Sequence, residues 1–153
     1  MPSDKYDLIG RLKAVEREHT ALRFTTDHAL RSLDEGGVEL EEGLKRLDVN
    51  RASERLEGTY IIRLFSEFEV ALKTILRQRK IKKIPRDAKP LINRVTSHVK
   101  FSGPILDNVH LVREYRNKLV HSLIYGIPDE QRMTIREVTS RLCTFLSRSL
   151  ARW

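Results

Sequence analysis

An arginine, an asparagine and a histidine stand close together in the segment REYRNKLVHS, whose surroundings have the leucine-rich spacing of amphipathic helix. A histidine exchanges protons near neutral pH because its unperturbed pKa is about 6.5, and an arginine offers a planar fork of donors to phosphate oxygens. On an ideal helix Asn117 and His121 share a face, whereas Arg116 points about 140° away from His121. These side chains can therefore converge on one phosphate only if the helix bends near its end or a second copy faces the first.

A strongly basic stretch precedes this segment. Between positions 77 and 89 the sequence RQRKIKKIPRDAK holds seven basic residues and one aspartate, a net charge of +6, in a chain whose formal net charge is +8. Such a localised field attracts polyanions, although a solvated connector between two helices would explain the same composition equally well. An anionic membrane surface is a poorer match because little apolar surface interleaves with the charges. The candidate phosphate-binding residues of this stretch are Arg77, Arg79, Lys80, Lys82 and Lys83.

Apolar residues recur at helical spacing along most of the chain. The pattern predicts a long amphipathic helix over about 3–33, and a second one over about 53–79 that has the widest apolar face and belongs at the centre of a bundle. Asn50 or Ser53 is the expected cap of this second helix. Shorter helices are expected over about 39–47 and 88–99, the latter capped by Asp87.

Two further helices complete the predicted fold. Pro104 suits the start of a helix that contains the arginine–histidine segment and is stopped by Gly126-Ile127-Pro128. The residues from Thr134 to Glu137 form a capping box, and the last helix should run from there to about position 150. We therefore expect one all-α domain over 1–153, a bundle of four main helices plus one or two short ones.

Several classes of function lack the residues that they need. Cys143 is the single cysteine, so no intramolecular disulfide can form, which suits a reducing cytoplasm. Neither a signal peptide nor an apolar run of 18 residues is present, so we expect a cytoplasmic protein without a membrane segment. No HExxH, cysteine pair, carboxylate–histidine cluster or phosphate-cradling glycine loop occurs, and we expect neither a metal nor another cofactor.

The run from Arg116 to His121 resembles the R-x4–6-H signature of the HEPN superfamily, including the polar residue, here Asn117, that usually follows the arginine. HEPN domains are small all-α bundles that carry this motif late in the domain. An earlier helix of the fold often has a pattern similar to FSEFEVALKTIL, in which an acidic residue, here Glu69, lies near the motif. The resemblance covers a HEPN-like core of about 53–150, and the long helix over 3–33 is compatible with it.

HEPN members with this motif are typically metal-independent endoribonucleases of toxin–antitoxin, abortive-infection and CRISPR systems, and they typically act as homodimers. The resemblance therefore implies that Arg116, Asn117 and His121 are catalytic, that Glu69 supports them, and that RNA is the substrate. A homodimer and a cognate antitoxin protein are the partners that it implies. Other members lack activity and serve as dimerisation modules or as binding modules for a nucleotide or a partner, which is the alternative interpretation.

On the RNA-cleaving interpretation, Arg113, Lys118 and the basic stretch would hold backbone phosphates without reading bases. No cluster of aromatic residues on which bases could stack is evident, so we expect the protein to discriminate only weakly between RNA sequences. A helical DNA-binding protein is a third and weaker alternative, because no convincing helix-turn-helix pattern is present.

Overall fold

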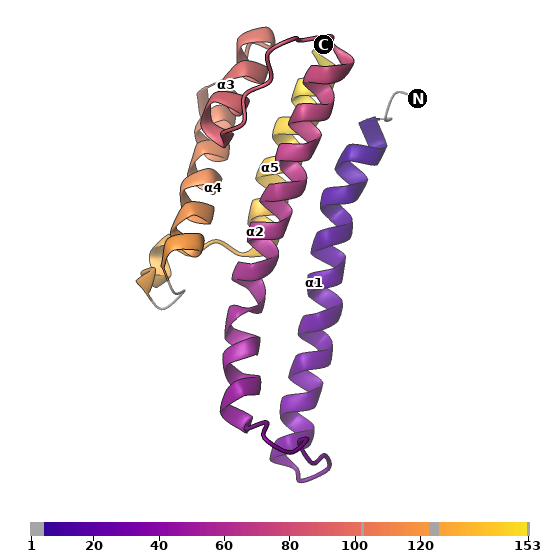
Figure 1. Ribbon diagram of the computed structural model, residues 1–153, viewed down its shortest axis with the longest axis vertical. Coiled ribbons are helices and arrows are strands. Elements are labelled where there is room, and N and C mark those ends of the chain that lie inside the picture. The colour runs from indigo at the N-terminus through magenta and orange to yellow at the C-terminus, as the bar shows by residue number, and fades with distance from the viewer. Residues whose placement is uncertain (1–4, 102, 123–125, 153) are drawn as a thin grey trace.

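The computed structural model describes residues 5–101, 103–122 and 126–152, and the regular structure in these residues is entirely helical (Figure 1). Within the described residues, the elements are four long helices, one shorter helix and the 3-10 turn, which confirms the predicted all-α bundle of four main helices plus short ones. Their bounds are Lys5–Asp34 for α1, Arg46–Gln78 for α2, Ala88–His98 for α3, Gly103–His121 for α4, Asp129–Gln131 for the 3-10 turn η2, and Ile135–Ala151 for α5.

Helix α2 is the central element of the bundle, as its apolar face predicts, since it packs against α1, α3, α4 and α5. On the side that faces the other helices, apolar residues recur every three or four positions and are buried from Ile61 to Leu76, whereas Val70 on the outer side is exposed. In the middle of the core, the ring centroid of Phe68 lies 5.6 Å from that of Phe65 and 5.7 Å from that of Phe145 on α5. Burial of each such side chain contributes about 1.5–3 kcal/mol, so α2 is the element on which the other helices depend.

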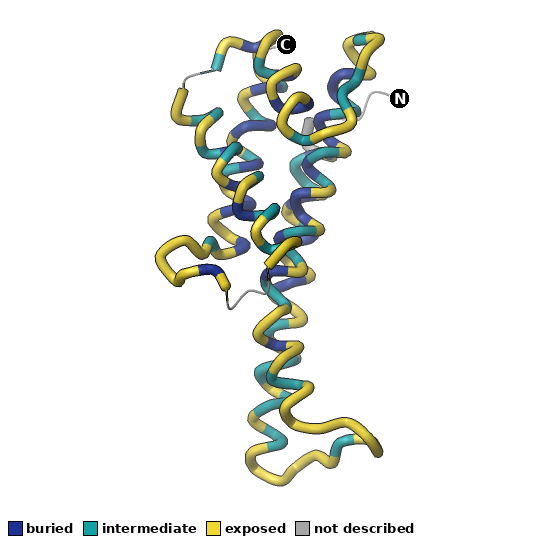
Figure 2. Tube along the Cα trace, turned by 60° about the vertical axis from the view of Figure 1, so that its left-hand side comes forward, coloured by how far each residue is buried: buried dark blue, intermediate teal, exposed yellow. Residues whose placement is uncertain are grey.

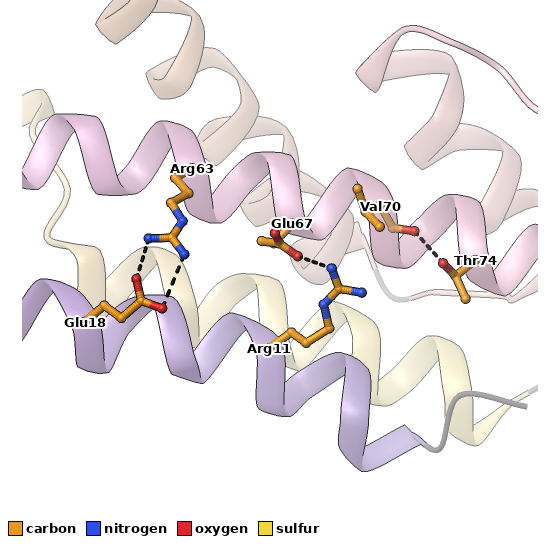
Figure 3. Close-up of polar contacts among 6 residues, drawn as sticks. All are labelled: Arg11, Glu18, Arg63, Glu67, Val70 and Thr74. Atoms are coloured by element: carbon orange, nitrogen blue, oxygen red, sulfur yellow. Dashed lines mark hydrogen bonds and ion pairs between the residues drawn. The ribbon is translucent and has the colours of Figure 1, made fainter.

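The lower halves of α1 and α2 extend beyond the other helices as a two-helix arm (Figures 1 and 2). Buried residues gather at the bundle end, whereas α1 beyond His19 and α2 before Ser53 contain only intermediate and exposed residues. Closer to the bundle, two ion pairs connect the solvent side of α1 to α2: Arg63 pairs with Glu18, and Arg11 Nη2 lies 2.8 Å from an Oε2 atom of Glu67 (Figure 3).

The start of α2 differs from the prediction. The helix begins at Arg46, so the expected cap at Asn50 or Ser53 is wrong, and so is the separate short helix over 39–47. The physical reason is Asp48, whose carboxylate accepts the backbone N–H of Lys45 at 2.9 Å and satisfies a donor at the helix entry. Ser53 lies inside the helix, and its hydroxyl accepts a hydrogen bond from Arg23 of α1 at 3.1 Å.

The other helix ends follow the sequence more closely. The capping box of α5 is confirmed, because Thr134 Oγ1 accepts the N–H of Glu137 at 3.2 Å and Glu137 accepts the N–H of Thr134 at 2.8 Å. Asp87 is the N-cap residue of α3, although its side chain makes no capping bond. Helix α4 ends at His121, and the predicted stop at Gly126-Ile127-Pro128 follows a segment, 123–125, that lies outside the described residues.

Candidate functional site

Arg116 of α4 is held in place by side chains of α2 and of its own helix. Its Cζ atom lies 4.7 Å from the ring centroid of Phe65, and its Nη2 atom lies 3.5 Å from Oε2 of Glu69. Its Nη1 atom donates a hydrogen bond of 3.1 Å to the side-chain oxygen of Asn117. Phe65 and Glu69 are four residues apart on α2 and therefore face the same side. Because a guanidinium has five N–H donors, these interactions orient Arg116 and leave further donors for a ligand.

A cavity of about 310 Å³ lies beside Arg116, between α2, the start of α3 and α4. It has four cationic side chains, two carboxylates and one amide in its wall, together with a small apolar residue. These are Arg86, Lys89, Arg113 and Arg116, then Glu69 and Asp87, then Asn117 and Ala88. The excess of positive charge makes this cavity suited to an anion.

Two of these cations, Arg86 and Lys89, are residues that the sequence analysis did not single out, although both belong to the basic stretch. Their position in the sequence could nevertheless have identified them as candidates for binding an anion. They flank Asp87, the expected cap of α3, and therefore stand at a helix N-terminus, where backbone N–H groups and the helix dipole favour anions. The basic stretch thus contributes to the site through its last residues rather than its first.

His110 orients Arg113, although no motif in the sequence marks this histidine. Arg113 Nε donates to Nδ1 of His110 at 3.4 Å, and Nε2 of His110 lies 3.2 Å from the side-chain oxygen of Asn93 on α3. Because Nδ1 accepts, Nε2 must carry the ring proton and donate to Asn93. Burial lowers the pKa of His110, and the positive charges of Arg113 and Lys89 lower it further, which favours this neutral form.

His121 stands apart from the cavity. It is the last residue of α4, its side chain is exposed, and it does not line the cavity that Arg116 and Asn117 share. Both Arg116 and His121 belong to one continuous helix, in which a separation of five positions corresponds to about 140° around the axis. Lys118, another predicted RNA-binding residue, donates instead to the side chain of Gln131 in η2 at 2.7 Å.

The first part of the basic stretch forms the end of α2 and the connector to α3. Its candidate residues are all exposed: Arg77, Arg79, Lys80, Lys82 and Lys83. Lys80 adopts a positive φ of 56°, and the N–H of Ile81 bonds back to the carbonyl of Leu76 at 3.0 Å, which ends the helix in a tight turn. Ile81 and Ile84 pack against the core, so the connector is anchored while its lysines remain available to solvent.

Other parts of the described chain are weaker candidates for a functional site. A larger cavity of about 620 Å³ lies between α1 and α5 and contains Cys143, but burial raises the pKa of that thiol to about 11, so it is protonated at neutral pH. Within residues 5–101, 103–122 and 126–152, no three His, Cys, Asp or Glu side chains are grouped so that they could hold a metal ion. None of the described helices is both long and apolar enough to cross a membrane.

Comparison of the chain with protein-family models, with curated proteins and with solved structures gave no match. The resemblance to HEPN domains therefore stays a prediction from the sequence, based on the run from Arg116 to His121 and on the pattern that contains Glu69. Function has to be argued from the geometry of the site itself.

Proposed function

We propose that this protein is a metal-independent endoribonuclease whose working unit is a homodimer. The observation that supports this most is the Arg116 guanidinium, which Phe65, Glu69 and Asn117 hold in place at the wall of a positively charged cavity. An arginine fixed in this way can bind a phosphate without first being ordered, which is how a preorganised site stabilises developing charge. The same helix ends in His121, an exposed histidine, which is the residue type that most often serves as a general acid or base.

RNA cleavage of this kind needs no metal because the substrate carries its own nucleophile. A base removes the proton of the 2′-hydroxyl, the 2′-oxygen bonds to phosphorus, and the bond from phosphorus to the 5′-oxygen breaks. An acid protonates the departing 5′-oxygen, and a 2′,3′-cyclic phosphate remains. In this proposal a His121 side chain supplies the base and water protonates the departing 5′-oxygen, Arg116 stabilises charge on the phosphoryl oxygens, and Asn117 orients Arg116.

A homodimer would supply what one copy lacks. His121 lies outside the Arg116 cavity of its own chain, and the straight course of α4 keeps the two side chains on different sides of the helix. Two α4 helices facing each other across a two-fold axis would bring His121 of one copy toward Arg116 of the other. Val120, half exposed between these residues in the sequence, offers apolar surface for such an interface.

The activity is tested by incubating purified protein with single-stranded RNA in the presence of EDTA. We expect products with 2′,3′-cyclic phosphate and 5′-hydroxyl ends, and no cleavage of a DNA strand of the same sequence. His121→Ala should lose nearly all activity, whereas His28→Ala, which removes a histidine of the arm, should keep it. Equal cleavage by the wild type and by His121→Ala would identify the activity as a contaminant and end the enzyme proposal.

A catalytically inactive HEPN-like module that binds RNA or a nucleotide is the second candidate. The exclusion of His121 from the cavity favours it, since a pure binding site would need only the cations. This candidate predicts RNA binding without cleavage, with Arg116→Ala weakening the binding. If cleavage is found instead, the accompanying expectation is a cytoplasmic toxin or defence effector, to be tested by co-purification of an antitoxin protein.

A further inference from the structure

The cavity beside Arg116 contains more positive charge than a single backbone phosphate requires. Its wall carries four cations and two carboxylates. Arg116 already pairs with Glu69, and Arg113 pairs with Glu114, but no carboxylate among the described residues pairs with Arg86 or Lys89. A phosphodiester has one negative charge, whereas a terminal phosphomonoester has about −1.5 to −2 at pH 7. The excess of two positive charges in the wall therefore matches a monoester better than a diester.

The cavity has donors on two sides, which suits a ligand with several free oxygens. Arg86 and Lys89 approach from the start of α3, and Arg113 and Arg116 approach from α4. The N–H groups of Ala88 and Lys89, in the first turn of α3, have no acceptor within the helix, and Asp87 does not cap them with its side chain. A monoester presents three acceptor oxygens to such donors, while a diester inside a chain presents two.

We propose that this cavity binds the 5′-terminal phosphate of an RNA strand, an inference that rests on the proposed function for the identity of the polymer. The connector points to a strand rather than a free nucleotide. Lys82 and Lys83 are exposed and lie just before Arg86 in the chain, so they extend the positive field away from the cavity along a path for the following nucleotides. The 5′ end would then be held in the cavity of one copy, while an internal phosphate lies at Arg116 of the other copy and His121 of the first.

AMP serves as the minimal probe of the cavity, with 3′,5′-cyclic AMP as a diester control and adenosine as a control without phosphate. We expect AMP to shift the backbone amide resonances of Ala88 and Lys89 in an NMR titration, cyclic AMP to bind about tenfold more weakly, and adenosine to leave these resonances unchanged. Cyclic AMP that binds as tightly as AMP would overturn the assignment to a monoester.

Matched variants separate the cavity from the general field of the basic stretch. Lys89→Gln and Lys82→Gln remove the same charge from exposed positions, but only Lys89 lines the cavity. Lys89→Gln should weaken AMP binding about 10- to 100-fold, the usual effect of losing one charge-assisted bond, and Lys82→Gln should weaken it less than about twofold. Asp87→Asn removes an opposing carboxylate and should tighten binding several-fold. Equal effects of Lys89→Gln and Lys82→Gln would overturn the proposal.

The polymer is tested with 2′-O-methyl RNA, which cannot be cleaved because its nucleophile is blocked. The wild type should bind a strand with a 5′-phosphate about tenfold more tightly than the same strand with a 5′-hydroxyl, and Lys89→Gln should abolish this preference. If AMP binds but the two strands bind equally, the assignment to an RNA end is wrong. Because no cleavage is involved, failure of the nuclease proposal leaves this result unaffected, and the two proposals can fail separately.

Discussion

Ion pairs between arginine and glutamate occur in two very different places in this protein. On the solvent side of α1 and α2, Arg63 pairs with Glu18, and about half of each side chain is exposed, at 49% (Figure 3). Between α4 and α2, Arg116 pairs with Glu69, and only 23% and 19% of these side chains are exposed. Both arginines lie over an aromatic ring, since Arg63 Cζ is 5.6 Å from the ring centroid of Tyr60 and Arg116 Cζ is 4.7 Å from that of Phe65, but Arg116 also stands at the wall of the charged cavity.

The difference shows how little the type of an interaction says about its role. Exposed pairs contribute little to folding, because solvent screens them and two long side chains must be ordered. Burying an ion pair costs desolvation that can cancel much of the attraction between its two charges, so stability gives no strong reason for an arginine at position 116. A phosphate-binding role does give one, since a guanidinium fixed beside a cavity is prepared for an anion.

The largest expected effect is on catalysis and separates the two arginines directly. Arg116→Ala should lower the rate of RNA cleavage by about 100- to 1000-fold, by analogy with removal of a single charge-stabilising donor elsewhere. Arg63→Ala removes a paired arginine from the outer side and should leave the rate within about twofold of the wild type. Single-turnover cleavage with circular dichroism on the same samples provides the comparison, and similar losses in both variants would remove the distinction between the pairs.

A smaller effect is expected for the exposed lysines of the connector. Changing Lys80, Lys82 and Lys83 to Glu should weaken RNA binding, because each lysine that neutralises a phosphate releases counterions. The slope of log K against log salt should become shallower by up to about 0.7 for each phosphate that is no longer neutralised. The measurement is fluorescence anisotropy with a 2′-O-methyl strand over a range of salt concentrations. A slope equal to that of the wild type would mean that the connector is only a solvated link between α2 and α3.

The smallest effect concerns stability and a histidine outside the site. His19 is only 6% exposed, packs beside Tyr60, and its Nε2 atom has no hydrogen-bond partner among the described residues. Burial lowers the pKa of His19 in the folded state, although Glu57 opposes this shift. As the pH falls below about 6.5, the unfolded chain binds a proton that the folded chain does not, so the free energy of unfolding decreases.

One such histidine changes the free energy of unfolding by at most about 1.4 kcal/mol per pH unit. His19→Leu should therefore make the free energy of unfolding decrease less steeply below pH 6.5. Some decrease should remain, because the pKa of His110 is lowered as well. Urea unfolding at three pH values between 5 and 7 gives the slopes. Parallel slopes for wild type and His19→Leu would show that His19 titrates normally in the fold.

Local patterns in the sequence were sufficient for most of the fold. The capping box of α5 could be predicted because Thr134 and Glu137 satisfy each other within one turn. The start of α2 could not, because Lys45 is a poor cap by type and the decisive bond comes from Asp48. The spacing of apolar residues nevertheless placed α2 at the centre, since a wide apolar face has to be covered on several sides.

The candidate site could be predicted only in part. Arg116 and Asn117 follow from the motif, and the structure places Glu69 3.5 Å from Arg116, while its supporting role in catalysis stays a prediction. Arg86 and Lys89 reach the site because α3 packs against α2 and α4, a tertiary arrangement that spacing along the chain does not reveal. The orienting bond from Arg113 to His110 depends equally on burial that no local pattern shows.

The central claim is that Arg116 of one copy works with His121 of another, and mixing two inactive variants tests it most directly. Arg116→Ala and His121→Ala should each be nearly inactive alone. After subunit exchange, up to about half of the dimers contain one variant of each kind, and each of these has one intact Arg116 and one intact His121 in the shared cleft. Mixing should therefore restore a substantial part of wild-type RNA cleavage, in proportion to the mixed dimer measured by native mass spectrometry. Mixed dimers that form and remain inactive would contradict the shared cleft.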